Sequence, residues 1–535
     1  MAEHSNSVEL TGESLTIEQV TRIARIPAIT VSISEAALAR VRKCREHIER
    51  IVKEYHDSLA NPSGRITHVY GVTTGFGEFK DEPVPPEQLV ELQQNILLSH
   101  SSGAGDSVDE NDPANYFSNE VVRAALVIRL NTLIKGFSGV RVEVVNYIAA
   151  MINKGVVPLV PTRGSVGSSG DLCPLAHLFV VMLGEGRFRL GNDLREAKEL
   201  PKVLNLAPVA PSYKEGLALT NGATFSAAQL ALAVHDAEVL AGVADVATAM
   251  AIEAICGRTR AYDEAIHDAR NMAGQRDSAA NIRALLSGSQ MSDRAKSLQD
   301  AYSIRCSPQV HGASRDTIAY AKMVVLAEIN AATDNPLFFP ELNRRPFDVQ
   351  SRLDRGDDPN ELGDERAFSA GNFHGQPIAL AADFLAIAVA ELANIAERRT
   401  QLLLDKNHNR NLPANLIAKR GVNSGLMLSQ YCAAGLVSEN KVLTHPASVD
   451  SIPTSANSED HNAMASIAAR KLRTVVSNCQ AVLAINLLAA TQAIDWRIGM
   501  NISPSAPTIS RNEVGAVIDK LEAAEDEARR FAEAM

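Results

Sequence analysis

Residues 163–177 read Arg-Gly-Ser-Val-Gly-Ser-Ser-Gly-Asp-Leu-Cys-Pro-Leu-Ala-His and are the most informative stretch of the chain. Glycine recurs there at every third position, which predicts a loop with unusual backbone angles. Apolar residues follow at once, beginning with Leu172. We therefore expect this loop to be set into a core rather than left as a linker.

The triplet Ser168-Ser169-Gly170 has a specific chemical capacity. The amide nitrogen of Gly170 can attack the carbonyl carbon of Ser168 if the backbone is tightly bent, because glycine has no Cβ to block the approach. Loss of two waters then leaves a five-membered ring, 4-methylidene-imidazol-5-one (MIO), in which the Ser169 side chain becomes an exocyclic methylidene. The plainer alternative is a Gly/Ser turn before a helix. We predict an electrophile that the chain makes from itself.

Helical patterns dominate the rest of the chain. Residues 225–256 are rich in alanine and apolar on nearly every face, which is typical of a buried helix. Apolar residues recur at helical spacing in 381–399 and again in 462–496. We predict a mostly α-helical protein in which an N-terminal MIO-bearing region precedes a long central helical bundle.

The predicted organisation has four consecutive parts. These are a flexible tail at 1–12, the MIO-bearing region at 13–224, the helical bundle at 225–504 and a C-terminal helix at 505–535. A stretch rich in charged residues at 340–366 is expected to be a solvated loop or insertion within the bundle.

Composition excludes several classes of protein. The chain has 535 residues, 46% of them hydrophobic, and a formal net charge of −11, which argues against a general nucleic-acid-binding protein. Its six cysteines show no Cys-x-x-Cys spacing, so we predict neither a metal site nor a disulfide framework. Dispersed thiols fit a reducing compartment. The apolar runs are interrupted by charges, so we expect a cytoplasmic protein without a membrane partner.

Longer motifs resemble those of the MIO-dependent aromatic amino acid ammonia-lyase and aminomutase family. They are Val-Tyr-Gly-Val-Thr-Thr-Gly-Phe-Gly at 69–77, Gln-Asn-Ile-Leu-Leu-Ser-His at 94–100, Leu-Thr-Asn-Gly at 219–222, Gln-Asp-Ala-Tyr-Ser-Ile-Arg-Cys at 299–306, Gly-Asn-Phe-His-Gly-Gln-Pro at 371–377 and Ser-Glu-Asn-Lys at 438–441. The likeness is greatest to family members that act on histidine. It implies an ammonia-lyase-like fold, a homotetramer, and non-oxidative deamination of L-histidine, a small amino-acid substrate, to trans-urocanate and ammonia.

The resemblance also implies catalytic roles for Tyr70, Ser168, Ser169, Gly170, Tyr302 and Glu439. Ser168 to Gly170 would form MIO. Ser168 stands where the family usually has alanine, and its side chain is expected to take no part. Tyr70 would be the acid/base on a lid-like loop, and Tyr302 would support MIO or the leaving amine. Asp171 would hold the loop and assist dehydration.

Substrate binding is implied for His100, Asn221, Gln299, Arg305 and Phe373. Arg305 would clamp the substrate carboxylate. Asn221 and Gln299 would donate to the MIO carbonyl or to the carboxylate, and Phe373 would pack beside MIO. The pair Ser99-His100 and the carboxylate of Glu439 match the histidine-specific form, because they can bond to ring N–H groups. Apolar neighbours of Glu439 predict that it is buried.

Three alternatives stay open. A related MIO enzyme would act on phenylalanine, tyrosine or a modified histidine, as a lyase or an aminomutase. A helical lyase of the fumarase and argininosuccinate lyase type shares the Gly-Ser-Ser sequence, but the Pro-x-Lys-x-Asn run that should follow is missing. A non-enzymatic scaffold would have lost Tyr70, Ser169, Gly170 and Arg305, and all four are present.

Overall fold

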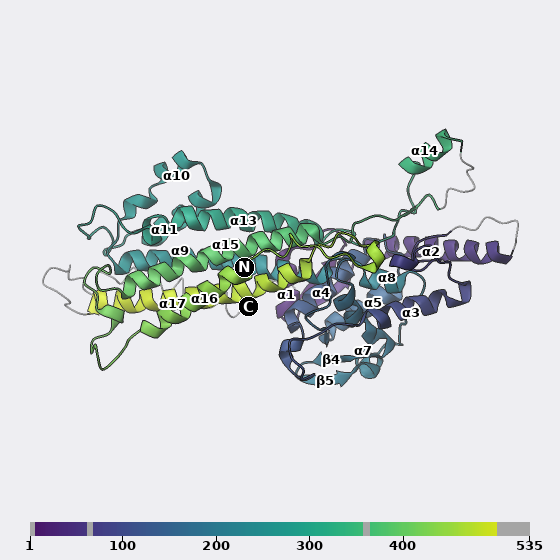
Figure 1. The fold of residues 1–535 in the computed structure, drawn as a ribbon, viewed down its shortest axis with the longest axis horizontal. Helices are drawn as coiled ribbons and strands as arrows, with labels where there is room; N and C mark the ends of the chain where they lie inside the picture. The colour runs from purple at the N-terminus through teal and green to yellow at the C-terminus, as the bar shows by residue number, and fades with distance from the viewer. Residues whose placement is uncertain (1–5, 61–67, 357–363, 500–535) are drawn as a thin grey trace. The chain divides into compact units, whose positions relative to one another are not determined.

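The computed structural model describes residues 6–60, 68–356 and 364–499. The chain divides into two compact units. Unit 1 comprises Met1–Leu232, Met323–Leu380 and Pro446–Arg470, and unit 2 comprises Ala233–Lys322, Ala381–His445 and Lys471–Met535. The prediction of a mostly helical fold is confirmed (Figure 1). We expected parts that follow one another along the chain. Unit 1 instead contains two later segments in addition to the N-terminal one.

In the described residues, unit 1 is built from helices of very different length, the longest of them α2, and three small sheets. Its helices are α1 (Ile17–Arg25), α2 (Glu35–Ala60), α3 (Leu89–His100), α4 (Asn119–Leu133), α5 (Val142–Asn153), α6 (Leu172–Phe179), α7 (Leu200–Leu204), α8 (Glu215–Thr220) and α14 (Phe347–Asp354). Strands β3 (Val156–Pro158), β4 (Arg187–Leu190) and β5 (Asp193–Glu196) form an antiparallel sheet. Helix α4 ends at Leu133 and α5 begins at Val142.

Two sequence expectations need correction in unit 1. The tail predicted at 1–12 contains β1 (Ser7–Leu10), which pairs in parallel with β2 (Thr30–Ile33) and so buries Val8 and Leu10. The stretch 340–366 is not only loop, because it contains α14 with Val349 buried, and strands β6 (Leu337–Phe338) and β7 (Ala367–Phe368) pair around it. The predicted C-terminal helix at 505–535 lies outside the described residues.

Helix α4 runs through the interior of unit 1. Every residue from Val121 to Leu133 is buried, including Arg123 and Arg129. Arg123 donates through Nε and Nη2 to the carbonyl oxygen of Ile23, at 2.9 and 2.7 Å. A buried guanidinium needs such partners, because an unpaired charge away from water is costly. The polar residues of α4 therefore connect elements that are far apart in the sequence.

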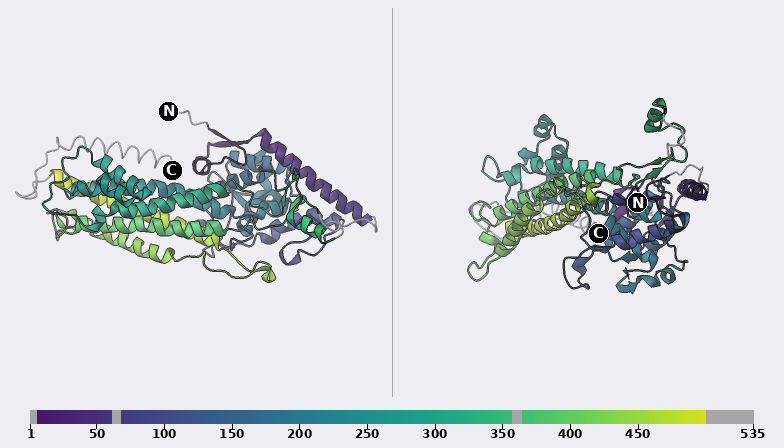
Figure 2. Two further views of the ribbon diagram at one scale, coloured as in Figure 1. Left: turned by 90° about the horizontal axis from the view of Figure 1, so that it is seen from above. Right: turned by 45° about the vertical axis from the view of Figure 1, so that its right-hand side comes forward.

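Unit 2 contains long helices that run alongside one another (Figures 1 and 2). Its long helices, in whole or large part, are α9 (Thr224–Ala254), α13 (Ser307–Glu328), α15 (Gln376–Leu404), α16 (Met427–Leu443) and α17 (Ala465–Gly499), with α10 (Glu264–Arg270), α11 (Ala273–Leu286) and α12 (Tyr302–Arg305) as shorter ones. Ile252, Leu403 and Ala490 belong to one buried cluster. The predicted helical bundle is confirmed within this unit.

Two of these helices, α15 and residues 465–498 of α17, are long and apolar enough to cross a membrane by length and composition alone. Core helices of large helical proteins also meet that criterion. In α15, 67% of the apolar window is buried inside the protein. Asp383 of α15 also accepts a bond from Lys471 of α17 at 3.0 Å, so the two helices pack through a charged pair as well as apolar contacts.

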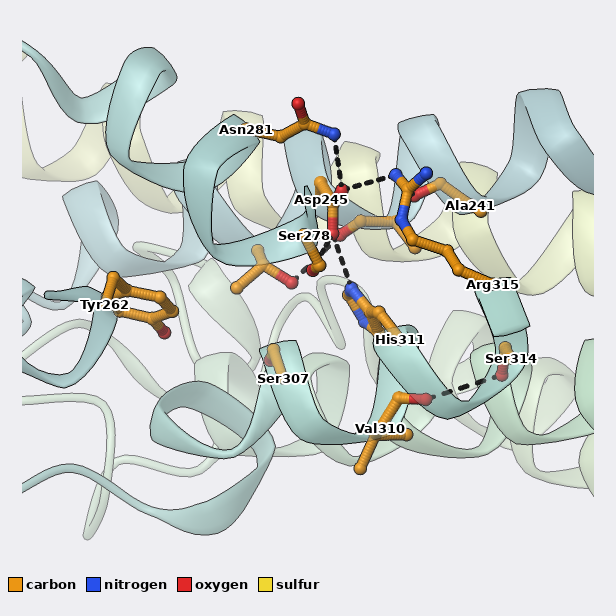
Figure 3. Close-up of polar contacts among 12 residues, drawn as sticks. Ala241, Asp245, Tyr262, Ser278, Asn281, Ser307, Val310, His311, Ser314 and Arg315 are labelled. Atoms are coloured by element: carbon orange, nitrogen blue, oxygen red, sulfur yellow. Dashed lines mark hydrogen bonds and ion pairs between the residues drawn. The ribbon is translucent and has the colours of Figure 1, made fainter. Parts of the chain in front are cut away.

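A buried polar network joins α9, α11 and α13 in unit 2 (Figure 3). Asp245 of α9 accepts bonds from His311 Nδ1 at 2.8 Å, Arg315 Nη2 at 2.6 Å, Ser278 Oγ at 2.5 Å and Asn281 Nδ2 at 3.1 Å. Burial alone would raise the pKa of Asp245, but these partners outweigh it and hold the pKa below its ordinary value. The carboxylate is therefore charged and compensated inside the bundle.

Replacing Asp245 by alanine should lower the free energy of unfolding by about 3–5 kcal/mol, because His311 and Arg315 would lose their buried anion. The exposed pair Lys322–Glu238, joined at 2.7 Å in the same unit, is a matched control. The change Lys322→Met should cost less than about 1 kcal/mol. Chemical denaturation followed by circular dichroism measures both, and equal losses would contradict this ranking.

Candidate active site

The loop that carries Ser168-Ser169-Gly170 is paired with the turn at Gly222, just after α8. The N–H of Gly222 donates to the carbonyl oxygen of Ser169 at 3.1 Å, and the N–H of Asp171 donates to the carbonyl oxygen of Gly222 at 2.8 Å. Gly170 has a φ of +70°, and a Cβ on it would lie 1.9 Å from the carbonyl carbon of Gly222. Only glycine allows this bend and this close backbone approach.

Ser168 has a role that sequence reasoning missed. Its hydroxyl oxygen accepts the N–H of Ala463 at 2.8 Å, and the side chain is buried. The same region is held by the N–H of Met464, which donates to Val166 O at 2.8 Å. This hydroxyl, which the usual alanine lacks, fastens the loop to Ala463. The expectation that the side chain takes no part in ring formation stays a prediction.

Asp171 ends the loop and is fully buried. Its carboxylate accepts bonds from Ser165 Oγ at 2.9 Å, Ser226 N–H at 2.7 Å and Ser226 Oγ at 3.0 Å. Burial raises the pKa of Asp171, while these hydrogen bonds act in the opposite direction. The bonds tie the loop to the start of α9, which agrees with the holding role expected for this residue.

The hydroxyl of Ser169 donates to Glu459 Oε1 at 3.0 Å. The other carboxylate oxygen of Glu459 accepts the hydroxyl of Thr454 at 2.6 Å. Sequence reasoning missed Glu459, which directly follows residues 455–458 and belongs to none of the motifs quoted above. The structure therefore places a carboxylate beside the serine that would lose its hydroxyl.

Glu439, the carboxylate that we expected in the site, lies on α16 of unit 2. It is exposed, and its Oε2 accepts the amide N–H of Asn478 at 2.8 Å. The burial predicted from its apolar neighbours is wrong, because Val442 is itself 73% exposed. Apolar neighbours in sequence do not bury a helix residue unless they face another element.

Tyr70 is half-buried in the loop that follows α2. Its phenolic oxygen accepts the N–H of Gly77 at 3.3 Å, and its ring meets that of Phe76 edge-on with centroids 6.3 Å apart. Burial raises the pKa of Tyr70, the Gly77 bond opposes this, and the charge of Glu459 adds to the rise. Tyr70 and Glu459 are therefore electrostatically coupled.

His100 is the last residue of α3, and its Nδ1 lies 3.0 Å from Ser99 Oγ. Burial lowers the pKa of His100, and the negative charge of Glu459 acts in the opposite direction. The imidazole is thus favoured in its neutral form, in which it has one donor and one acceptor nitrogen. Unit 1 brings Ser169, Glu459, Tyr70 and His100 into one electrostatic environment.

Asn221 does not offer the donor that we expected. Its Nδ2 donates to Asn335 O at 3.1 Å and to Asp334 Oδ1 at 3.5 Å, so both amide hydrogens face the protein. Its Oδ1 is buried without a partner among the described residues. The donor to Ser169 O is instead the backbone N–H of the next residue, Gly222.

Phe373, the other residue expected beside the ring, is half-buried in unit 1. It precedes Gly375, whose N–H donates to Gly167 O at 2.9 Å. The segment that carries Phe373 is therefore fastened to the Ser168–Gly170 loop.

Gln299, Tyr302 and Arg305 belong to unit 2. The guanidinium carbon of Arg305 lies 4.6 Å from the centroid of the Tyr302 ring, so the two side chains lie on one helix face. Arg305 Nε also donates to Asp300 O at 3.0 Å. Tyr302 is 72% exposed, and Gln299 is exposed as well.

No group of three or more His, Cys, Asp or Glu side chains in the described parts of the chain is arranged to hold a metal ion. Ser169 is contacted by the carboxylate of Glu459, which can accept a proton, and by the N–H of Gly222, which can stabilise charge on an oxygen. The phenol of Tyr70 and the imidazole of His100 lie within range of the charge of Glu459.

Comparison with known proteins gives consistent matches. The family described as aromatic amino acid lyase matches residues 15–518. A protein named histidine ammonia-lyase from Caldanaerobacter subterraneus subsp. tengcongensis is 44% identical over 506 residues, covering 94% of this chain and 91% of that protein.

Solved structures agree with these sequence matches. The histidine ammonia-lyase of Trypanosoma cruzi matches with a TM-score of 0.79 and 38% identity, covering 97% of this chain and 94% of that one. The tyrosine aminomutase of Streptomyces globisporus matches with a TM-score of 0.81 and 34% identity, covering 98% of each.

His177, on the helix after the loop, should make the stability of the protein depend on pH. Its Nε2 accepts the N–H of Gly103 at 3.0 Å, and burial lowers its pKa to about 4. An unfolded histidine takes up its proton near pH 6.5, so stability should fall as the pH drops from about 6.5 to 4, by at most about 1.4 kcal/mol per pH unit. In His177→Gln the thermal midpoint should vary less over this window, and an unchanged profile would contradict the assignment.

Proposed function

The chain belongs to the aromatic amino acid lyase family, and from this premise we propose that it deaminates L-histidine to trans-urocanate and ammonia. The 44% identity to a named histidine ammonia-lyase supports this substrate. The observation that carries the proposal is the contact between Ser169 and Glu459 at 3.0 Å, in the electrostatic environment shared with His100. A carboxylate and a neutral imidazole are suitable partners for the ring N–H groups of histidine.

We propose that Ser168-Ser169-Gly170 cyclise to MIO. The new bond joins the Gly170 nitrogen to the carbonyl carbon of Ser168, and the first water takes that carbonyl oxygen with the amide hydrogens of Gly170 and Ser169. The second water takes the Ser169 hydroxyl with its α-hydrogen. The bend at Gly170 and its pairing with Gly222 support this closure.

The ring supplies an electrophilic methylidene that takes up the substrate amine and makes it a leaving group. The carbonyl oxygen of Ser169 is retained in the ring, and the N–H of Gly222 that donates to it would stabilise negative charge there. Tyr70 is the proposed acid/base for the β-proton, since the Gly77 N–H that bonds its oxygen would stabilise a phenolate. Glu459 and His100 would hold the imidazole of the substrate.

Arg305 is the proposed clamp for the substrate carboxylate, with Tyr302 and Gln299 beside it.

We also propose that the protein is a cytoplasmic homotetramer. Tyr302 is exposed in the single chain, and so are the apolar residues Leu428, Tyr431 and Val442 of α16. Exposed apolar side chains in such number are typical of surfaces that meet another protein chain. Contact with further copies of the chain would cover them.

The second candidate is a related lyase or aminomutase that acts on tyrosine, phenylalanine or a modified histidine. The likeness to the tyrosine aminomutase structure supports keeping it. A phenyl ring, however, would offer no hydrogen bond to Glu459 Oε1 or to His100 Nε2, the atoms that Thr454 and Ser99 do not occupy, at a cost of about 1–3 kcal/mol each.

Purified protein should convert L-histidine to urocanate, which is followed by its near-ultraviolet absorbance, and should not convert L-phenylalanine or L-tyrosine. The variant Ser169→Ala should be inactive, because it lacks the hydroxyl that must leave to form the methylidene. Intact mass should show the loss of two waters in the wild type only. Turnover of phenylalanine or tyrosine instead of histidine would overturn the proposed substrate.

Two carboxylate variants test the site directly. Glu459→Gln should lower kcat/KM for L-histidine by roughly 100-fold or more, as expected for a polar group that contacts the reacting atoms. Glu91→Gln is the matched control, since it removes the same charge from an exposed residue of α3 and should remain near the wild type. Glu439→Gln tests the assignment made from the sequence, and a loss larger than that of Glu459→Gln would restore it.

A further inference from the structure

The short helix α8 ends at the Asn221–Gly222 turn and so determines where that turn lies. A helix of 6 residues has little stability of its own, so its position depends on the contacts around it. Helices α3 and α6 pack against α8, and three buried charged residues add polar contacts at its ends and middle, namely Arg129, Lys214 and Asp334.

Lys214 precedes α8 and has a φ of +69°, in the left-handed region that a lysine rarely adopts. Its Nζ donates to Asp334 Oδ2 at 2.6 Å, and neither side chain is exposed. The ion pair therefore holds the start of α8 in a strained conformation.

Asp334 also reaches the other end of α8. Its Oδ1 accepts the amide of Asn221 at 3.5 Å and the N–H of Asn335 at 2.6 Å. One carboxylate thus connects the residue before α8 with the residue after it. Losing its charge would loosen both ends of the helix at once.

Arg129 of α4 contacts the middle of α8 and the turn. Its Nη2 donates to the carbonyl oxygen of Ala218. Its Nη1 lies 2.9 Å from the position that a Cβ on Gly222 would occupy. Among the described residues, its Nε and Nη1 have no hydrogen-bond partner. Such a buried, partly unpaired guanidinium is costly to stability and calls for a functional explanation.

We propose that Arg129, Lys214 and Asp334 are positioning residues for ring formation, which press the Asn221–Gly222 turn against residues 169–171 and keep the loop bent. The inference rests on the proposed function. The two hydrogen bonds of Gly222, at 3.1 and 2.8 Å, hold the residues on either side of Gly170, whose nitrogen must attack. A misplacement of about 1 Å can cost roughly 100-fold in rate.

Intact mass spectrometry of Arg129→Gln and Asp334→Asn tests the inference. Only protein that elutes as folded in gel filtration, with the circular dichroism of the wild type, is measured. We expect the fraction of chains that have lost two waters to fall by roughly 10-fold or more in each variant. Arg129→Lys should recover part of it, because lysine keeps the charge and a donor for Ala218 O.

Arg123→Gln is the matched control for loss of a buried arginine. Arg123 lies on the same helix and is 3% exposed, but it bonds to Ile23 O and Ile152 O rather than to α8. Its replacement should lower the thermal midpoint and leave the loss of two waters complete. That outcome separates a general loss of stability from a specific effect on the loop.

The outcomes separate this inference from the proposed function. A wild type that has not lost two waters would overturn both. If the wild type has lost them, three results overturn the inference alone. The first is a loss of two waters in Arg129→Gln and Asp334→Asn that is as complete as in the wild type. The second is equal impairment in Arg123→Gln. The third is a failure of both test variants to give folded protein, which would assign these residues to general folding.

Discussion

The two hydrogen bonds of Gly222, one to Ser169 and one from Asp171, are the contact on which the site in unit 1 depends. They require two backbones to approach more closely than any side chain at Gly170 would allow. Once that pairing exists, the peptide between the bonds is bent, and the Ser169 carbonyl has a donor. Around it, Asp171 fixes one end of the loop, and Ser168 ties the middle to residue 463. The reactive geometry thus follows from backbone contact rather than from the serines alone.

A buried carboxylate with several hydrogen-bond partners occurs in each unit. In unit 2, Asp245 is surrounded by donors from α11 and α13, which joins three helices at a point where apolar packing alone would be less directional. In unit 1, Asp334 does the same for the two ends of α8. Hydrogen bonds to a buried carboxylate have directions as well as strength. Such groups therefore set the positions of helices and not only their stability.

Glu459 links the separate parts of the site through its charge. It contacts Ser169 directly, raises the pKa of Tyr70 and acts against the lowering of the pKa of His100. In a partly buried site these effects are stronger than in water. In the proposed reaction, a single carboxylate would therefore influence the hydroxyl that leaves during ring formation and the two groups assigned to the substrate.

The amino-acid sequence alone determined the features that depend on near neighbours in the chain. These include the helical class and the glycine-dependent bend at 164–170. Periodicity and local backbone freedom are enough for them. Only the tertiary structure decided that Glu459 accepts the hydroxyl of Ser169, 290 residues away, and that Ser168 accepts the N–H of Ala463. It also decided that the side-chain amide of Asn221 donates to the carbonyl oxygen of Asn335. Such contacts form between segments that are distant in sequence, and no local pattern records which of them meet.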